Sequence, residues 1–164
     1  VVEAQKLMQS DIVVEVCGDT PLIDPDIIDL AIETFLNNDC HVVSNTNKLS
    51  FPQGLDAQVF SLDSLEWVAN NIQDPAVREH VSLYFYENPD TYRIVHLLAP
   101  RHWQAPEIRL QMDYPEDHQL ICEIFERLEP KFGEEFGVEE ILDLLRRNPN
   151  LATINEHCEE MAVR

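Results

Sequence analysis

Two acidic residues follow apolar segments in the same way at distant points of the chain. Asp19 comes directly after the β-branched run Ile12–Cys17, in the turn sequence CGDTP, and Asp113 comes directly after Ile108–Met112, in MDYPED. Open α/β sheets bind ligands beyond the carboxyl ends of their strands. Mg²⁺ is commonly held by one or two carboxylates together with phosphate oxygens and water. The pair therefore predicts a Mg²⁺ site made by Asp19 and Asp113.

Each acidic turn also has a local interpretation. An aspartate in a turn can hydrogen-bond its own backbone, which would account for Asp19 without a metal ion. Asp113 or Tyr114 could be the N-cap of a helix that begins at Pro115, with the acidic residues of the first turn favoured by the helix dipole. The residues alone leave both interpretations open.

Three further places carry candidate binding residues. Gly54 allows a positive φ or a close backbone approach to a ligand, and Asp56 projects from the same loop, although a tight turn explains this loop equally well. Glu79 and His80 lie in an apparently helical segment, where a single histidine is more often packed or exposed than catalytic. Arg109 lies inside a predicted strand, so it must be paired or reach a ligand.

The elements that position these residues follow a regular pattern. Helical spacing over 1–9 leads into the run 12–17, and Asp24 with Pro25 predicts the start of a second helix, followed by a strand over 40–44. This order of helix and strand favours a parallel α/β unit. Later strands are expected at 57–60, 92–98 and 108–112, and helices at 62–71, 75–87, 115–128, 137–147 and partly over 151–164.

We expect one domain over residues 1–164, because no repeat or low-complexity linker interrupts the pattern. The chain opens inside a helix that leads into a core strand, and it contains no GxG loop. A doubly wound domain that begins in this way is expected to lack its first strands.

The composition excludes several classes of function. The 164 residues include 31 Asp and Glu against 11 Lys and Arg, with no basic stripe for long nucleic acid. No apolar run approaches the roughly 20 residues of a membrane span, and no signal peptide is apparent. The 4 cysteines lack the short spacing of Cys/His zinc ligands, so a zinc site is not expected. We expect these cysteines to be reduced thiols in a cytoplasmic protein.

Taken together, five segments in this order resemble the cytidylyltransferase family that includes the spore-coat polysaccharide (SpsF-type) enzymes. Acylneuraminate and 3-deoxy-manno-octulosonate cytidylyltransferases are more distant relatives. The resemblance covers nearly the whole chain. It is carried by Ile12–Asp29, Val43–Thr46, Phe51–Ser61, Arg78–Pro89 and Glu107–Ile121.

The resemblance implies a Rossmann-like nucleotidyltransferase fold of the glycosyltransferase-A type, with a mostly parallel sheet flanked by helices. The implied reaction joins CTP to a sugar or sugar acid, giving a CMP- or CDP-sugar and pyrophosphate in cell-surface polysaccharide biosynthesis. It also implies a homodimer, which we expect to form through the excursion Ala99–Pro106. On this resemblance Asp19 and Asp113 are the catalytic Mg²⁺ ligands. The substrate-side or supporting positions that it implies are Gly54, Asp56, Glu79, His80 and Arg109.

The chain departs from the family at several places. The basic, Gly-rich loop that holds the triphosphate is missing, so the chain corresponds to the carboxy-terminal portion of the fold. Glu15 stands where a basic residue is frequent, Gln58 where Glu is frequent, and Gln111-Met112 where the family has Thr-Val. We therefore expect the chain by itself to bind CTP poorly and to be inactive. The alternatives are a non-catalytic sugar-nucleotide-binding or oligomerisation partner, and another nucleotidyl- or glycosyltransferase of this fold.

Overall fold

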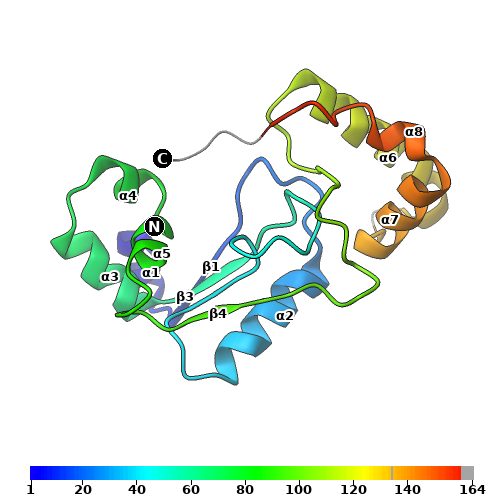
Figure 1. Ribbon diagram of the computed structural model, residues 1–164. Helices are drawn as coiled ribbons and strands as arrows, with labels where there is room; N and C mark the ends of the chain where they lie inside the picture. The colour runs from blue at the N-terminus through cyan, green and yellow to red at the C-terminus, as the bar shows by residue number, and fades with distance from the viewer. Residues whose placement is uncertain (134, 160–164) are drawn as a thin grey trace.

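A four-stranded mixed sheet lies at the centre of the computed structural model, which describes residues 1–133 and 135–159 (Figure 1). The strands follow the order β1-β3-β2-β4 across the sheet. β1 and β2 run antiparallel to β3, and β4 runs parallel to β2, so β3 alone opposes the other three. The predicted α/β fold with helices flanking a sheet is therefore confirmed, and the sheet is mixed, since two of its three strand pairs are antiparallel. The strands are β1 (Ile12–Glu15), β2 (Val42–Ser44), β3 (Gln58–Ser61) and β4 (Ile94–His96).

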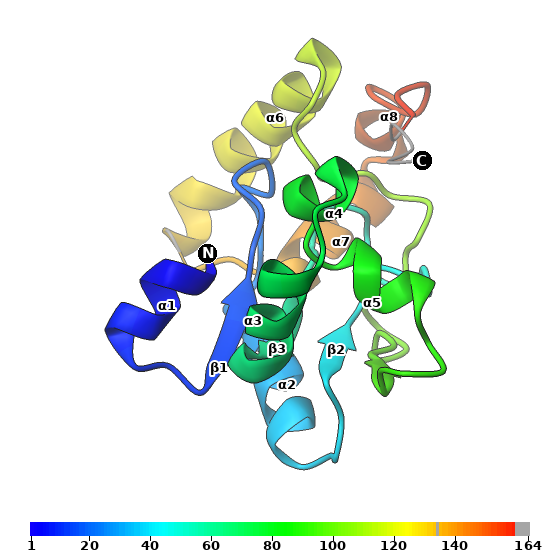
Figure 2. The ribbon, with the colours of Figure 1, turned by 90° about the vertical axis from the view of Figure 1, so that its left-hand side faces the viewer.

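Helices flank this sheet in two groups (Figures 1 and 2). The first group comprises α1 (Val2–Met8), α3 (Leu62–Asn71), α4 (Pro75–Glu79) and α5 (Leu83–Glu87). The second comprises α2 (Pro25–Leu36), α6 (Pro115–Phe132), α7 (Val138–Arg147) and α8 (Pro149–Ala152). Among the described residues, no helix combines the length and the apolar character needed to cross a membrane.

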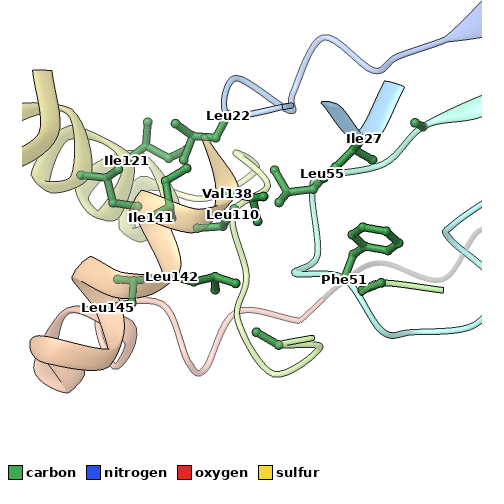
Figure 3. Packing of buried hydrophobic residues seen from close by; sticks show 14 of the residues in the cluster. Leu22, Ile27, Phe51, Leu55, Leu110, Ile121, Val138, Ile141, Leu142 and Leu145 are labelled. Atoms are coloured by element: carbon green, nitrogen blue, oxygen red, sulfur yellow. The ribbon is translucent and has the colours of Figure 1, made fainter. Parts of the chain in front are cut away.

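The period-two alternation of the strands divides the apolar side chains between two cores. Val13, Phe60 and Val42 are cross-strand neighbours, and they pack with α3, α4 and α5. The next row, which contains Val59 and Val43, faces the opposite way and packs with α2, α6, α7 and α8. Figure 3 shows part of this second core, where side chains from the helices meet the loop residues Leu22, Leu55 and Leu110. The sheet is thus covered by helices on both faces.

One buried carboxylate caps two helices of the second group. Asp24, the predicted N-cap of α2, accepts a hydrogen bond from the Asp26 N–H at Oδ1, with an N···O distance of 2.8 Å. Its Oδ2 accepts from the Val138 N–H, at 2.7 Å, at the start of α7. A Cβ on Gly137 would lie 2.3 Å from the same Oδ2. Glycine at this position therefore lets the two helix ends share one cap.

Two predicted elements differ from the structure. Residues 108–112 do not form a strand; they make a single parallel bridge, between Gln53 and Arg109, because their partner is a loop. The helix expected over 75–87 is divided into α4 and α5, since His80 has φ −115° and ψ 89°. This break lets Phe85 pack against Phe60 with ring centroids 5.4 Å apart. Tertiary packing therefore overrides the continuous helical pattern.

The predicted tail helix over 151–164 is also shorter than expected. Helix α8 begins earlier, at Pro149, and ends at Ala152, and residues 160–164 lie outside the described part of the chain. In the excursion 99–106, the ring of Trp103 lies 6.5 Å from that of Phe51 and packs against the second core. A homodimer formed through this excursion stays a prediction.

Candidate metal and substrate site

Asp19 and Asp113 lie on backbone segments that contact each other. The N–H of Met112, the residue before Asp113, donates a hydrogen bond to the carbonyl oxygen of Asp19, with an N···O distance of 2.9 Å. The side-chain amide of Gln111 donates to Asp19 Oδ2 at 3.0 Å. The fold thus brings together two acidic turns that are far apart in the sequence. A metal ion shared by the two carboxylates stays a prediction.

The free side of Asp19 has the character of a cation ligand. Its Oδ1 is buried and has no hydrogen-bond partner among the described residues, and the same holds for Oε2 of Glu15 at the end of β1. A buried carboxylate oxygen without a partner is costly. A divalent cation, whose preferred ligands are such oxygens, would remove that cost. These residues therefore fit the Mg²⁺ ion that the sequence predicts.

Negative charge gathers around the end of β1. The pKa of the Cys17 thiol is raised above its ordinary value by burial first, and then by the carboxylates of Asp19, Glu15 and Asp56. The pKa of Glu15 is also raised, because burial outweighs the opposing effect of the nearby His80. Asp56, predicted from the sequence as a substrate-side residue, thus lies close enough to affect the pKa of Cys17 as well. The local field favours a bound cation.

Asp113, whose side chain is 34% exposed, lies at the edge of an ionic network centred on the buried Arg109. Nη2 of Arg109 contacts Asp113 Oδ2 at 2.5 Å, and Nε contacts Asp117 Oδ1 at 3.1 Å. The side chain of Arg109 is only 5% exposed. The side-chain amide of Asn155 completes the network by donating to Asp117 Oδ1 at 2.7 Å. Arg109 therefore holds the turn that carries Asp113. This contact corresponds to a supporting position, one of the two roles that the resemblance implies for Arg109.

Hydrogen bonds decide the charge state of Asp117. Burial acts to raise the pKa of Asp117, but the hydrogen bonds from Arg109, from Asn155 and from two backbone N–H groups lower it below its ordinary value. Those backbone donors are Asp113 and Tyr114, each 3.0 Å from Oδ2. Tyr114 is the N-cap of α6, as one local interpretation predicted. Asn155 was not identified from the sequence, since no motif surrounds it.

Gly54 permits a close approach between two loops rather than only a turn. Its φ is 86°, and a Cβ there would lie 2.3 Å from the backbone nitrogen of Gln111. Hydrogen bonds from the Gln53 N–H to Ile108 and from the Leu110 N–H back to Gln53 hold the two loops together. A pocket of about 40 Å³ lies between segments 45–56 and Gln111, with Asp56 in its lining. Gly54 and Asp56 therefore lie beside the segment that orients Asp19.

A tyrosine that sequence reasoning missed joins three of the five family-like segments. The hydroxyl of Tyr86 in α5 lies 2.6 Å from Gln58 Oε1, 2.7 Å from Ser44 Oγ and 3.2 Å from Thr46 Oγ1. Burial is the main reason that its pKa is raised, and the carboxylates of Glu15 and Asp56 add to the effect. The sequence predicts only a helix over this segment, and nothing in its spacing singles out this hydroxyl.

Glu79 and His80 lie at the end of α4 and are both exposed. Glu79 lines a cavity of about 550 Å³ between α1, α3 and α4, which Glu15 also reaches. His80 is close enough to Glu15 to lower the pKa of that carboxyl, against the larger effect of burial. These two predicted residues therefore lie near Glu15, and a role in substrate binding stays a prediction for both.

Comparison with known proteins now identifies the family. The model of the family described as cytidylyltransferase matches residues 1–161. The chain belongs to the cytidylyltransferase family. The resemblance carried by the five segments is thereby confirmed.

Two curated proteins and one solved structure are similar to nearly the whole chain. The spore coat polysaccharide biosynthesis protein SpsF of Bacillus subtilis is 30% identical over 159 residues, which are 95% of this chain and 62% of that protein. An uncharacterised protein of Methanocaldococcus jannaschii is 31% identical over 161 residues, 98% of this chain and 64% of that protein. A cytidylyltransferase structure from Leptospira borgpetersenii superimposes with a TM-score of 0.85 at 26% identity, covering 98% of this chain and 65% of that one. The chain thus spans a little less than two thirds of the length of these relatives.

Proposed function

We propose that this chain provides the metal- and sugar-binding part of a Mg²⁺-dependent sugar cytidylyltransferase in cell-surface polysaccharide biosynthesis. The reaction would join CTP to a sugar or sugar acid, giving a CMP-sugar and pyrophosphate, or to a sugar phosphate, giving a CDP-sugar and pyrophosphate. Family membership supports the reaction class. The observation that carries the proposal is the buried Oδ1 of Asp19, which has no hydrogen-bond partner within residues 1–133 and 135–159 and lies beside the segment that leads into Asp113.

The residues at the strand ends would act by position and charge. In this reaction an oxygen of the sugar substrate bonds to the α-phosphorus of CTP, and the bond from that phosphorus to the bridging oxygen of the leaving pyrophosphate breaks. Bound Mg²⁺ would neutralise phosphate charge at Asp19 and Asp113. Gln111 orients Asp19, and Arg109 orients Asp113. Prepositioned charges of this kind account for much of the rate in phosphoryl-type transfers.

The charge of the chain limits what it binds by itself. The formal net charge is −20, which repels a triphosphate, and no basic Gly-rich loop occurs in residues 1–164. Substrate binding would therefore depend on the cation and on basic groups supplied from outside this segment. We accordingly propose that the isolated chain binds Mg²⁺ but binds CTP weakly and does not turn over.

Calorimetric titration with Mn²⁺, a substitute for Mg²⁺, tests the metal site directly. We expect Asp19→Asn to weaken Mn²⁺ binding by about tenfold or more, since ligand charge sets the affinity of such sites. Asp63→Asn, which changes an exposed aspartate in the first turn of α3, is the matched control and should bind as the wild type does. Equal affinity in the wild type and in Asp19→Asn would remove Asp19 from the proposed site.

A non-catalytic binding partner is the second candidate. The observation in its favour is that the Gln111 amide already occupies Oδ2 of Asp19, so that one of the two oxygens is taken. The two candidates differ in what a complete protein containing this chain does with CTP, Mg²⁺ and sugar acids. Pyrophosphate release supports the enzyme, whereas metal-dependent binding of a sugar nucleotide without pyrophosphate release supports the binding partner.

A further inference from the structure

Three side chains with different metal-binding atoms meet at the beginning of α6. Glu116 lies in the first turn of that helix, and His157 and Cys158 follow α8. A carboxylate oxygen, a ring nitrogen and Sγ from these residues all lie within 4.8 Å of one another. Nε2 of His157 is 3.8 Å from Glu116 Oε1. None of these three residues belongs to the proposed Mg²⁺ site, and the proposed transferase reaction does not use them.

The segment that carries His157 and Cys158 is held against α6 at both ends. Before these residues, the buried side chain of Asn155 donates to Asp117 Oδ1 at 2.7 Å, and the Cys158 N–H donates to the Asn155 carbonyl at 2.9 Å. After them, the Tyr114 hydroxyl donates to the Glu159 carbonyl at 3.2 Å. The three ligand atoms therefore meet because of fixed backbone contacts, and not only through the rotation of long side chains.

We propose that Glu116, His157 and Cys158 bind one Zn²⁺ ion, with water as the fourth ligand. Oxygen, nitrogen and sulfur donors together select zinc over Mg²⁺, which takes oxygen ligands. Ligand bonds of about 2.0–2.3 Å in a tetrahedral zinc site place the ligand atoms about 3.3–3.8 Å apart. The ligand atoms, which lie up to 4.8 Å apart, therefore have to approach one another by about 1 Å. Rotations of the side chains can supply this movement. The exposed fractions, 41% for Glu116 and 65% for His157, leave room for that movement.

The local charge also favours a cation. Glu116 and Asp117 place two carboxylates in the first turn of α6, next to the proposed ligands. Arg109 is already paired with Asp117 and Asp113. A divalent cation would offset this concentration of negative charge. Sequence spacing argued against zinc because the ligands come from two distant segments, which only the fold brings together.

Helix α6 itself provides a matched control. His118 and Cys122 lie one turn apart on it, and Cys122 Sγ is 3.7 Å from His118 Nε2. This pair offers one nitrogen and one sulfur atom without the carboxylate of the proposed site. Because it could bind a soft metal weakly, Cys122→Ser distinguishes the two positions.

Titration of the metal-stripped 164-residue chain with Co²⁺, followed by displacement with Zn²⁺, tests the proposal. We expect one equivalent to bind with a thiolate-to-cobalt charge-transfer band, and Zn²⁺ to remove that band. Cys158→Ser should abolish the band, and Cys122→Ser should retain it. His157→Gln and Glu116→Gln should each weaken Co²⁺ binding by about 10-fold or more. Loss of a partner outside the ligand shell already weakens metal binding by about 10–100-fold.

Thermal melts of the same proteins provide a second measurement. Zn²⁺ should raise the Tm of the wild type and of Cys122→Ser, but not that of Cys158→Ser, because a ligand that binds the native state stabilises it. Circular dichroism establishes that each variant is folded. The proposal is overturned if the wild type shows no thiolate band, or if the band disappears in Cys122→Ser and persists in Cys158→Ser.

Discussion

The side-chain amide of Gln111 donates a hydrogen bond to Asp19 Oδ2, with an N···O distance of 3.0 Å. This contact fixes the orientation of the Asp19 carboxylate and leaves its buried Oδ1 without a partner among the described residues. It is reinforced by the backbone bond from Met112 to Asp19. The acidic turn after β1 is therefore positioned by the segment that ends in Asp113, so the two halves of the candidate site cannot move independently.

We predict that Asp19→Asn and Asp113→Asn each abolish turnover in a complete enzyme that contains this chain. Their effects on stability should differ. Asp19→Asn should leave the Tm unchanged or raise it, since it removes a buried charge, whereas Asp113→Asn loses the contact with Arg109 and should cost about 0.2–1 kcal/mol. Turnover assays and thermal melts measure both effects. Wild-type turnover in either variant would exclude that residue from the metal site.

Gly54→Ala should destabilise the fold more than the same change at Gly133 or Gly18. It combines a φ of 86° with a Cβ that would lie 2.3 Å from the Gln111 nitrogen. Gly133 has a φ of 65°, but no atom of the described part of the chain lies within 4 Å of its Cβ position, so Gly133→Ala should cost only about 1 kcal/mol. Gly18→Ala meets neither obstacle and should be nearly neutral. Urea unfolding of the three variants should give this order, and equal losses at Gly54 and Gly133 would show that the two loops can separate.

Asp117 should make the protein sensitive to acid. Because its folded pKa is lowered, its contribution to stability is present above the unfolded value of about 3.9 and is lost as the pH falls through the folded pKa. Asp117→Asn should lower the free energy of unfolding at neutral pH by about 3 kcal/mol, since it breaks a buried ion pair. The variant should also show a weaker decline in stability below about pH 4.

Chemical denaturation between neutral and acid pH measures this difference. Asp143→Asn is the matched control, because Asp143 pairs with Arg147 on the surface of α7. Exposed pairs of this kind contribute about 0–1 kcal/mol, so the control should follow the wild-type pH profile. A profile of Asp117→Asn that runs parallel to the wild type would show that another group causes the acid sensitivity.

The shared cap predicts non-additive mutations. Asp24→Ala removes the acceptor of two helix ends and should cost about 2 kcal/mol, roughly 1 kcal/mol for each cap. Gly137→Ala alone should also destabilise, because its Cβ meets Asp24 Oδ2. The double variant should lose less than the sum of the two, since Asp24→Ala relieves the clash. Urea unfolding gives the coupling, and Asp29→Asn, at an exposed position of α2, is the control.

Local signals in the sequence were sufficient where a single segment determines its own structure. Asp24 and Pro25 begin α2 as predicted, and α3 has the predicted bounds because Ser61 caps an amphipathic run. The strand over 108–112 was wrong because its partner, Gln53, lies on a loop that pairs at one position only. Apolar alternation records burial, and it does not record whether a neighbouring strand is present.

For the candidate site, the sequence indicated the acidic residues but not the groups that hold them. Asp19 and Asp113 stand out because each follows an apolar run, whereas Asn155 and Tyr86 act through contacts with residues far away in the chain. The amide of Asn155 reaches the carbonyl of Arg109 at 3.1 Å across 46 positions. No local pattern encodes such a contact. A single sequence therefore identifies the reactive groups sooner than it identifies their supports.

The bond between the Val138 N–H and Asp24 also sets an order on biosynthesis. Its acceptor leaves the ribosome 114 residues before its donor, so the cap is completed only after the start of α7 has been translated. A nascent chain arrested before that point would leave the apolar side of α2, with Ile27 and Ala31, unprotected by its later partners. Exposed surface of this kind is what chaperones bind and what aggregates, so slow translation of the carboxy-terminal third would lower the yield of folded protein.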